Sequence, residues 1–372
     1  MRFRDIIGQE DVKQHLRLSV QQGRVPHAQM LVGKQGTGKM QLAVAYAQYL
    51  NCTNRTAEDS CGECPVCRQF ERLEHPDLMF TFPIVKSDKS DTCSTYYNEF
   101  RELFLERRYF SADDWYRKLG VEKKQGMIYE NESQEILHKL SLKSFGNGYK
   151  VLIIWQPEKM NATCANKILK IVEEPPEQTV FILVTEHPEQ MLSTIISRVQ
   201  QIRVNELTQA DLQPYFPDDI IRISSGSYLE ARNLQEGAEE RQQFFDDFVA
   251  LMRHAWKVGH KRAYDDLLEL RKWSLAIADS KLGRERQKAF LQYAQRQVRE
   301  NYIRNFAVPD AVYQTDSESA FSTNFSRFIN EGNVQKIMDE LAKAERQIEQ
   351  NGNAKIIFFD LCLQMIVLIK KG

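Results

Sequence analysis

The chain has 372 residues, of which 42% are hydrophobic and 27% charged, and its formal net charge is −1. This length and apolar content are enough for two or three domains with buried cores. The near-zero net charge excludes a chain drawn as a whole to nucleic acid, so any such contact needs a local patch. The start, MRFRDIIGQEDVK, lacks the apolar core of a signal peptide, and the longest apolar run, residues 356–369, is too short and too interrupted to cross a bilayer. We therefore expect a cytoplasmic protein with no membrane partner.

Short apolar runs alternate with longer helical patterns through the first 205 residues. Residues 30–32 lead into a glycine-rich loop, and a helical pattern follows over 39–50. Further strand candidates are residues 78–85, 151–155, 179–185 and 200–204. Apolar runs of four to eight residues are typical of strands that are buried on both faces. Their alternation with helices predicts an α/β domain with a parallel sheet.

The glycine-rich loop, GKQGTGKM, matches the phosphate-binding P-loop G-x-x-x-x-G-K-[ST] at every position but the last. Backbone N–H groups of such a loop form an anion nest at a helix N-terminus, and its lysine reaches a phosphate. Gly33, Gly36, Gly38 and Lys39 are therefore the candidate phosphate-contacting residues. Met40 replaces the hydroxyl that binds Mg²⁺, and a thioether does not ligate this hard cation. We expect no Mg²⁺ site, and binding of ATP without hydrolysis stays open.

Four cysteines lie within sixteen residues, in the order Cys52, Cys61, Cys64 and Cys67. The last three form overlapping C-x-x-C pairs, and Cys52 closes the set from the end of the preceding helical pattern. Four thiolates suit a tetrahedral structural Zn²⁺ site with no open coordination position, so this module, at about 51–70, predicts stabilisation and not catalysis. An iron–sulfur cluster is the main chemical alternative, followed by a redox pair or four unrelated buried cysteines.

The strand candidate 151–155 ends where a hydrolysing P-loop enzyme would carry Asp-Glu, to hold the metal and activate water. Here these positions are Trp155 and Gln156, and Glu158 follows two residues later, past a proline. Loss of a general base alone typically costs 10²–10⁴-fold in rate. This predicts a P-loop domain that does not hydrolyse ATP.

Three parts are expected along the chain: an α/β P-loop domain over 1–205, a small helical segment over 206–236 and an all-helical domain over 237–372. Within the first part, residues 86–130 are rich in charge and aromatic side chains and are interpreted as an insertion without readable function. Seven basic residues between 281 and 304 are interleaved with aromatic residues and could face DNA, but such a run is more often a solvated helix face.

Four segments taken together resemble the AAA+ subunits of the bacterial sliding-clamp loader, and within that family the delta-prime subunits of DNA polymerase III. These are IIGQEDVKQHL, GRVPHAQMLVGKQGTGKM, the cysteine cluster and NKILKIVEEPPEQTVFILVTEHPEQMLSTIISRV. The resemblance is dense over 5–80 and 133–205 and architectural beyond. It implies an AAA+ domain with a zinc module, a helical lid and a C-terminal all-α collar. It also implies a hetero-pentamer with gamma/tau and delta subunits, which loads the sliding clamp onto primed DNA within the DNA polymerase III holoenzyme, a DNA-directed DNA polymerase.

The resemblance also assigns residues. Ser197-Arg198-Val199 matches the family's Ser-Arg-Cys motif in its first two residues, so Arg198, with Ser197, would be an arginine finger for a neighbour's ATP. Leu229 stands where active relatives carry a sensor arginine. With Met40 and the altered strand end, this implies an ATPase-inactive stator.

Two other functions remain open. The first is a gamma/tau-like clamp-loader ATPase that uses Lys39, Glu158 and Thr185 in an unusual arrangement. The second is a zinc-containing DNA-binding module that uses the cysteine lobe or the basic stretch 281–304.

Overall fold

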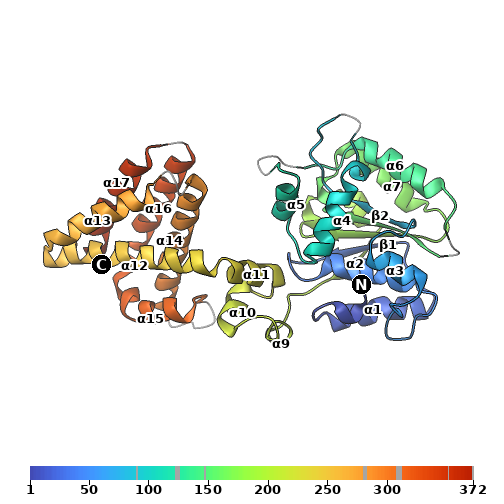
Figure 1. Ribbon diagram of the computed structural model, residues 1–372, viewed down its shortest axis with the longest axis horizontal. Coiled ribbons are helices and arrows are strands. Elements are labelled where there is room, and N and C mark those ends of the chain that lie inside the picture. The colour runs from blue at the N-terminus through green and yellow to red at the C-terminus, as the bar shows by residue number, and fades with distance from the viewer. Residues whose placement is uncertain are drawn as a thin grey trace. The chain divides into compact units, whose positions relative to one another are not determined.

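The computed structural model describes residues 1–88, 91–121, 126–145, 148–279, 283–306, 312–350 and 352–370. The chain divides into two compact units (Figure 1). The first contains residues 1–216 and 224–232, and the second contains residues 217–223 and 233–372. The three-part division at 205 and 236 is finer than these units and stays a prediction.

The first unit is built on a five-stranded parallel sheet in the order β2-β3-β4-β1-β5. The strands are β1 (Ala28–Val32), β2 (Leu78–Thr81), β3 (Lys150–Trp155), β4 (Thr179–Thr185) and β5 (Gln200–Arg203). The first four are almost wholly buried, as their apolar sequences predict, whereas the edge strand β5 buries only Ile202. The expected parallel α/β domain is confirmed.

One predicted strand is too long. The sequence pattern suggested residues 78–85, but β2 ends at Thr81. Pro83 has no N–H to donate to a neighbouring strand, so the ladder cannot continue through it. Ile84 instead makes an isolated antiparallel bridge with Met127.

Helices cover both faces of this sheet (Figure 1). The helices of the first unit are α1 (Glu10–Gln21), α2 (Lys39–Asn51), α3 (Pro65–Glu71), α4 (Tyr97–Glu106), α5 (Ala112–Lys118), α6 (Glu130–Ser141), α7 (Ala162–Glu173), α8 (Ser193–Ile196), α9 (Gln209–Leu212) and the first part of α11 (Tyr228–Glu236). Successive residues of β3 point to opposite faces: Ile153 joins the core under α2 and α4, and Ile154 joins the core under α6 and α7. The helix α2 is buried from Lys39 to Leu50, polar residues such as Gln41 and Gln48 included, so apolar residues occupy all of its faces.

Part of the predicted insertion belongs to the first of these cores. The rings of Phe100 on α4 and Trp115 on α5 pack with Phe82 beyond the end of β2. The helix α5 begins with a capping box, in which the side chains of Ser111 and Asp114 each accept a hydrogen bond from the backbone N–H of the other residue. Residues 86–88, 91–121 and 126–130 are thus integral to the α/β unit, whereas the rest of the insertion lies outside the described residues.

The described part of the second unit is helical. Its elements are α10 (Asp218–Ser224, up to residue 223), the end of α11, α12 (Ala238–Lys261), α13 (Tyr264–Ile277), α14 (Arg284–Arg304), α15 (Asp316–Phe325), the 3₁₀ turn η7 (Ser326–Phe328), α16 (Val334–Glu349) and α17 (Ala354–Lys370). Its own core includes Phe248, Leu291, Leu341 and Phe358. The apolar run at 356–369 lies in α17, which is packed among α12, α13 and α16. No helix within the described ranges is long and apolar enough to cross a membrane.

Candidate functional site

The glycine-rich loop connects β1 to α2, as a P-loop does. Gly33 comes so close to β5 that a Cβ there would lie 2.1 Å from the backbone oxygen of Val204. Gly38 caps α2 with φ of 93°, a conformation that L side chains rarely adopt. The backbone of the predicted phosphate loop is therefore preserved, and only glycine fits at both positions.

Lys39 is turned into its own loop. Its ammonium Nζ donates to the backbone oxygens of Gly33 at 2.7 Å and Lys34 at 2.5 Å, and the residue is only 6% exposed. Burial lowers the pKa of Lys39 to about 8, although Glu186 and Glu158 counteract this shift. These two hydrogen bonds hold the Lys39 ammonium against the loop's own backbone. A phosphate would have to compete with the two backbone oxygens for the ammonium.

The space above the loop is filled by side chains. The residues that line it are Gln35, Gly36, Gly38, Lys39, Met40, Gln41, Arg108, Tyr109, Phe110, Trp155, Val184 and Glu186, and they leave a cavity of about 40 Å³. A space of this kind needs roughly 10–15 Å³ to hold one water molecule, so the cavity has room for only a few waters. Small-molecule pockets occupy roughly 300–1,000 Å³. The space above Lys39 is therefore much smaller than a typical small-molecule pocket.

Three residues of the insertion, Arg108, Tyr109 and Phe110, contribute to this lining. The Tyr109 ring packs against Tyr228 with centroids 4.5 Å apart, and its backbone oxygen accepts a hydrogen bond from Arg232 at 2.8 Å. The neighbouring Phe110 packs edge-on against Trp155 at 5.2 Å. The backbone oxygen of Arg108 accepts a hydrogen bond from the side chain of Gln41, on α2. We call residues 108–110 the plug segment. Nothing in the sequence pattern indicated this role.

The residues at the end of β3, where an active enzyme would carry Asp-Glu, pack into the surrounding structure. Trp155, where a metal-binding carboxylate was expected in an active enzyme, is 7% exposed and belongs to the core. Gln156 adopts a left-handed backbone with φ of 54°, and its buried Oε1 has no hydrogen-bond partner among the described residues. The hydroxyl of Thr185 donates to Glu158 at 2.7 Å. Burial raises the pKa of Glu158 and also that of Glu186, a carboxylate beside Lys39 that the sequence pattern did not single out.

The segment around Leu229 closes on the same loop. The N–H of Tyr228 donates to the oxygen of Gly36 at 3.1 Å, and Leu229 is buried at 2% exposure. An apolar side chain therefore occupies the place where the resemblance expected an arginine in active relatives.

Arg198 lies away from this loop, just after α8. Its Nε lies 2.5 Å from Oε1 of Glu173, the last residue of α7, and both side chains are about 40% exposed (42% and 38%). Its Nη1 donates to the Thr194 backbone oxygen at 3.0 Å and to the Ser197 hydroxyl at 3.2 Å. The side chains of the neighbouring residues Ser197 and Arg198 are thus joined by a hydrogen bond, and the role of Arg198 as an arginine finger stays a prediction. No sequence pattern indicated the contact with Glu173, because a contact between the end of α7 and the residue after α8 has no signature in local spacing.

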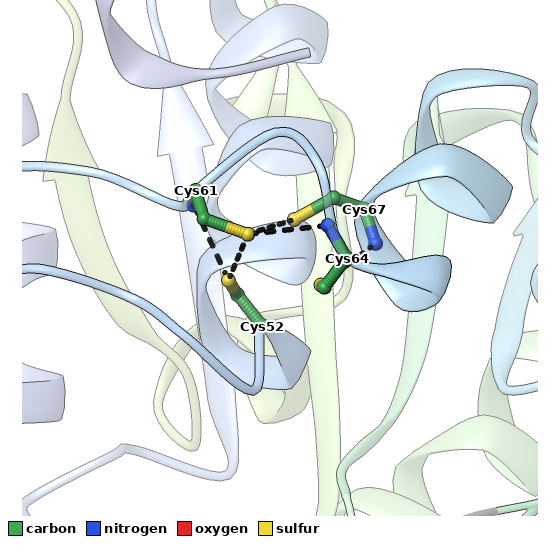
Figure 2. Close-up of side chains that lie close together, drawn as sticks. All are labelled: Cys52, Cys61, Cys64 and Cys67. Carbon is green, nitrogen blue, oxygen red and sulfur yellow. Dashed lines mark hydrogen bonds between the residues drawn. The ribbon is translucent and has the colours of Figure 1, made fainter.

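The four predicted cysteines come together (Figure 2). Cys52, Cys61, Cys64 and Cys67 place their Sγ atoms within 4.8 Å of one another, and none forms a disulfide. The Cys52–Cys61 and Cys61–Cys67 sulfur distances are 3.6 and 3.8 Å. A tetrahedron with Zn–S bonds of about 2.3 Å requires sulfurs about 3.8 Å apart. The donor set and its spacing therefore fit a zinc ion.

Backbone N–H groups support these sulfurs. Sγ of Cys61 accepts from the N–H groups of Glu63 and Cys64, and these hydrogen bonds lower its pKa. Sγ of Cys64 accepts from Cys67 N–H at 3.4 Å. Such N–H···S contacts favour the thiolate form that a metal requires.

The basic stretch on α14 is mostly engaged within the second unit. Arg286, Lys288 and Arg296 form ion pairs with Glu240, Glu349 and Glu318 respectively. Phe290 and Tyr293 are buried in the core. Lys281 lies outside the described residues. These contacts favour a structural role for the stretch.

Comparison with known proteins identifies the family. The family described as DNA polymerase III, delta subunit, matches residues 8–208, more than half of the chain and nearly all of the α/β unit. The chain belongs to this family. It is therefore a member of the bacterial clamp-loader subunits of DNA polymerase III, as its sequence motifs predicted.

Two curated relatives illustrate the range within the family. The delta-prime subunit of Bacillus subtilis is 31% identical over 254 residues, covering 66% of this chain and 63% of the relative. The gamma subunit of Buchnera aphidicola is 24% identical over 295 residues, covering 78% and 70%. Among solved structures, a gamma-subunit-related protein of Thermotoga maritima has a TM-score of 0.40 at 12% identity, covering 97% of this chain and 99% of that one. The family assignment does not depend on this weak structural likeness.

Proposed function

We propose that this chain is the delta-prime subunit of a DNA polymerase III clamp loader and has no ATPase activity of its own. The observation that carries the proposal is the filled P-loop: the plug segment and Trp155 leave only about 40 Å³ above Lys39. The likeness to a delta-prime subunit at 31% identity supports the same assignment.

The chemistry of the site agrees with inactivity. Met40 offers no oxygen to Mg²⁺, and Trp155 and Gln156 offer neither a metal ligand nor a general base. Removing metal-ion stabilisation of the transferred phosphoryl group forfeits several kcal/mol of transition-state stabilisation. Even a nucleotide that displaced the plug segment would find no group to activate water at the usual place.

The role of the subunit would then be mechanical and electrostatic. In this proposal the chain is an AAA+ stator that joins gamma/tau and delta subunits in a pentamer through its second, helical unit, which acts as a collar. Arg198 would supply a positive charge to ATP held by an adjacent gamma/tau subunit, and such fingers are worth 10³–10⁵ in rate. The complex would load the sliding clamp onto primed DNA.

The four cysteines would hold a structural zinc ion. A closed four-sulfur site has no position for substrate, so the ion would tie residue 52, at the end of α2, to the start of α3. This links the cysteine module to the helix that carries the P-loop, and no catalytic step passes through the metal.

The test is ATP turnover by a complex reconstituted with gamma/tau and delta. We expect no turnover by the isolated chain, and a lower rate in the complex when Arg198→Ala replaces the wild type without loss of assembly. Arg203→Ala, an exposed arginine on β5, is the matched control and should leave the rate unchanged.

The rival function is a gamma/tau-like ATPase, and the similarity of this chain to relatives named gamma and tau subunits is consistent with it. Turnover by the isolated chain that Lys39→Ala abolishes would establish this rival and overturn the proposal. Tight, strongly salt-dependent DNA binding by the isolated chain would instead favour a DNA-binding module.

A further inference from the structure

We propose that Glu173 is a positioning residue, which holds the Arg198 guanidinium in the orientation that reaches the neighbouring subunit's ATP. This rests on the proposed function, because it assumes that Arg198 acts in trans. Glu173 belongs to the run Glu-Glu-Pro-Pro at the end of α7, which by sequence alone is only a helix end before two prolines.

The contacts of Arg198 fix two of its three nitrogen atoms. Nε is paired with the Glu173 carboxylate, and Nη1 donates to the Thr194 backbone oxygen and the Ser197 hydroxyl. Within the described residues, no hydrogen bond from Nη2 is found. A guanidinium has five N–H donors in one plane, so fixing Nε and Nη1 also fixes the direction of the two Nη2–H groups. These two donors are available for a phosphate oxygen.

The carboxylate comes from a more rigid element than the arginine does. The helix α7 buries Ile168, Ile171 and Val172 in the core, and its chain leaves through two prolines that restrict the backbone. The α8 helix before Arg198, by contrast, is a single turn of four residues. A long, half-exposed side chain at the end of such a turn would sample many rotamers without the pair to Glu173.

The Glu173–Arg198 ion pair should contribute more to the orientation of the Arg198 side chain than to folding stability. Ion pairs as exposed as this one add little to folding stability, because solvent screens them and ordering the side chains costs entropy. Orientation is different: a displacement of about 1 Å in a group that acts on the transition state can cost about 10²-fold in rate. Loss of Glu173 should therefore affect turnover and leave folding nearly unchanged.

The test uses the complex reconstituted with gamma/tau and delta. Four variants of this chain are compared with wild type: Glu173→Ala, Glu173→Gln, Arg198→Ala and the double variant with alanine at both positions. The measured quantity is the part of the ATPase rate that Arg198→Ala removes. Glu174→Gln is the matched control, since it removes the same charge one residue further along the same turn.

We expect Glu173→Ala to lower this part of the rate about tenfold through kcat, with KM for ATP nearly unchanged. Glu173→Gln should retain more of it, because an amide oxygen still offers an acceptor near Nε. The double variant should equal Arg198→Ala alone, since Glu173 acts only through the arginine. Glu174→Gln should match wild type.

Each other outcome overturns the inference in a recognisable way. If Arg198→Ala lowers the rate and Glu173→Ala does not, Glu173 has no positioning role although the proposed function stands. If the double variant is slower than Arg198→Ala, Glu173 acts independently of the arginine. If neither Glu173 variant assembles, the residue serves subunit packing. If Arg198→Ala itself has no effect, the proposed finger fails and the inference falls with it.

Discussion

Lys39 occupies the lysine position of the P-loop pattern, and its ammonium is bound to the backbone of its own loop. In a phosphate loop the ammonium is held for an anion, but here it bonds the backbone oxygens of Gly33 and Lys34 and is nearly buried. Its pKa is lowered to about 8 by burial. The folded state therefore binds fewer protons at this residue than the unfolded chain does when the pH lies between about 8 and 10.5.

This shift makes stability depend on pH with a definite sign. Because the unfolded state binds more protons here, the free energy of unfolding gains a term that grows as pH rises from about 8 towards 10.5. The term is absent in Lys39→Met. We expect wild-type stability to rise relative to that variant by up to about 3 kcal/mol over this window. Urea unfolding of both proteins at several pH values measures it, and parallel pH profiles would contradict the lowered pKa.

The cysteine site gives a second prediction at this scale. The purified protein should contain about one zinc ion per chain and no iron–sulfur absorbance. Cys64→Ala should abolish zinc binding and cost several kcal/mol of stability, because metal binding contributes to folding free energy. Metal analysis and thermal unfolding measure the two effects. Cys164→Ala, an isolated buried cysteine, is the control that should keep its zinc. Full zinc content in Cys64→Ala would show that Cys64 is not a zinc ligand.

At the scale of elements, the insertion acquires a role that its composition did not reveal. Its helices α4 and α5 pack on the core, and the segment between them enters the space above the P-loop. The plug segment is anchored from three sides, by α2 through Gln41, by β3 through Trp155 and by α11 through Tyr228 and Arg232. Blocking the site is thus a property of several elements together and not of one substituted residue.

Removing the plug segment should therefore separate binding from hydrolysis. In Tyr109→Ala/Phe110→Ala we expect weak but measurable binding of a fluorescent ATP analogue, because Lys39 and the loop backbone become accessible. Hydrolysis should stay undetectable, since Met40, Trp155 and Gln156 are unchanged. Tyr116→Ala, a half-buried tyrosine of the same insertion that does not line the cavity, should bind nothing. If wild type, Tyr109→Ala/Phe110→Ala and Tyr116→Ala all fail to bind the analogue, the plug segment is not what excludes nucleotide.

Among the described residues, the buried hydrophobic residues of the two units form separate sets. One set lies on the two faces of the parallel sheet, and the other is enclosed by the helices from α12 to α17. The second contains a buried charge centre: Glu318, 1% exposed, is paired with Arg241 at 2.8 Å and accepts a hydrogen bond from Tyr293 at 2.7 Å. Breaking a buried pair leaves an uncompensated charge, which costs about 3–5 kcal/mol.

Separate cores predict separate unfolding. Calorimetry should resolve two unfolding transitions. Glu318→Ala should lower the free energy of unfolding of the second unit alone, by about 3–5 kcal/mol. A zinc chelator should lower the stability of the first unit alone, because the four cysteines belong to that unit. Glu331→Ala, an exposed glutamate of the second unit, should lower neither. A single transition that shifts with either treatment would show that the two units unfold as one.

Much of the fold could be predicted from local pattern. Apolar runs between helical patterns indicated four of the five strands close to their observed bounds, and the alternation indicated a parallel sheet. The glycines of the P-loop, the cysteine spacing and the Ser197-Arg198 pair were found because each lies in a contiguous motif. The strand at 78–85 was predicted too long, because its apolar character continues past Pro83 although its hydrogen bonding cannot.

Residue types at fixed spacing are enough to predict the fold class of this protein, its family and the chemical groups available to it. How those groups are used depends on the tertiary structure. The plug segment reaches Lys39 from seventy residues away, and Glu173 reaches Arg198 from another helix. Such contacts depend on how the sheet brings distant segments together, and no local periodicity encodes them.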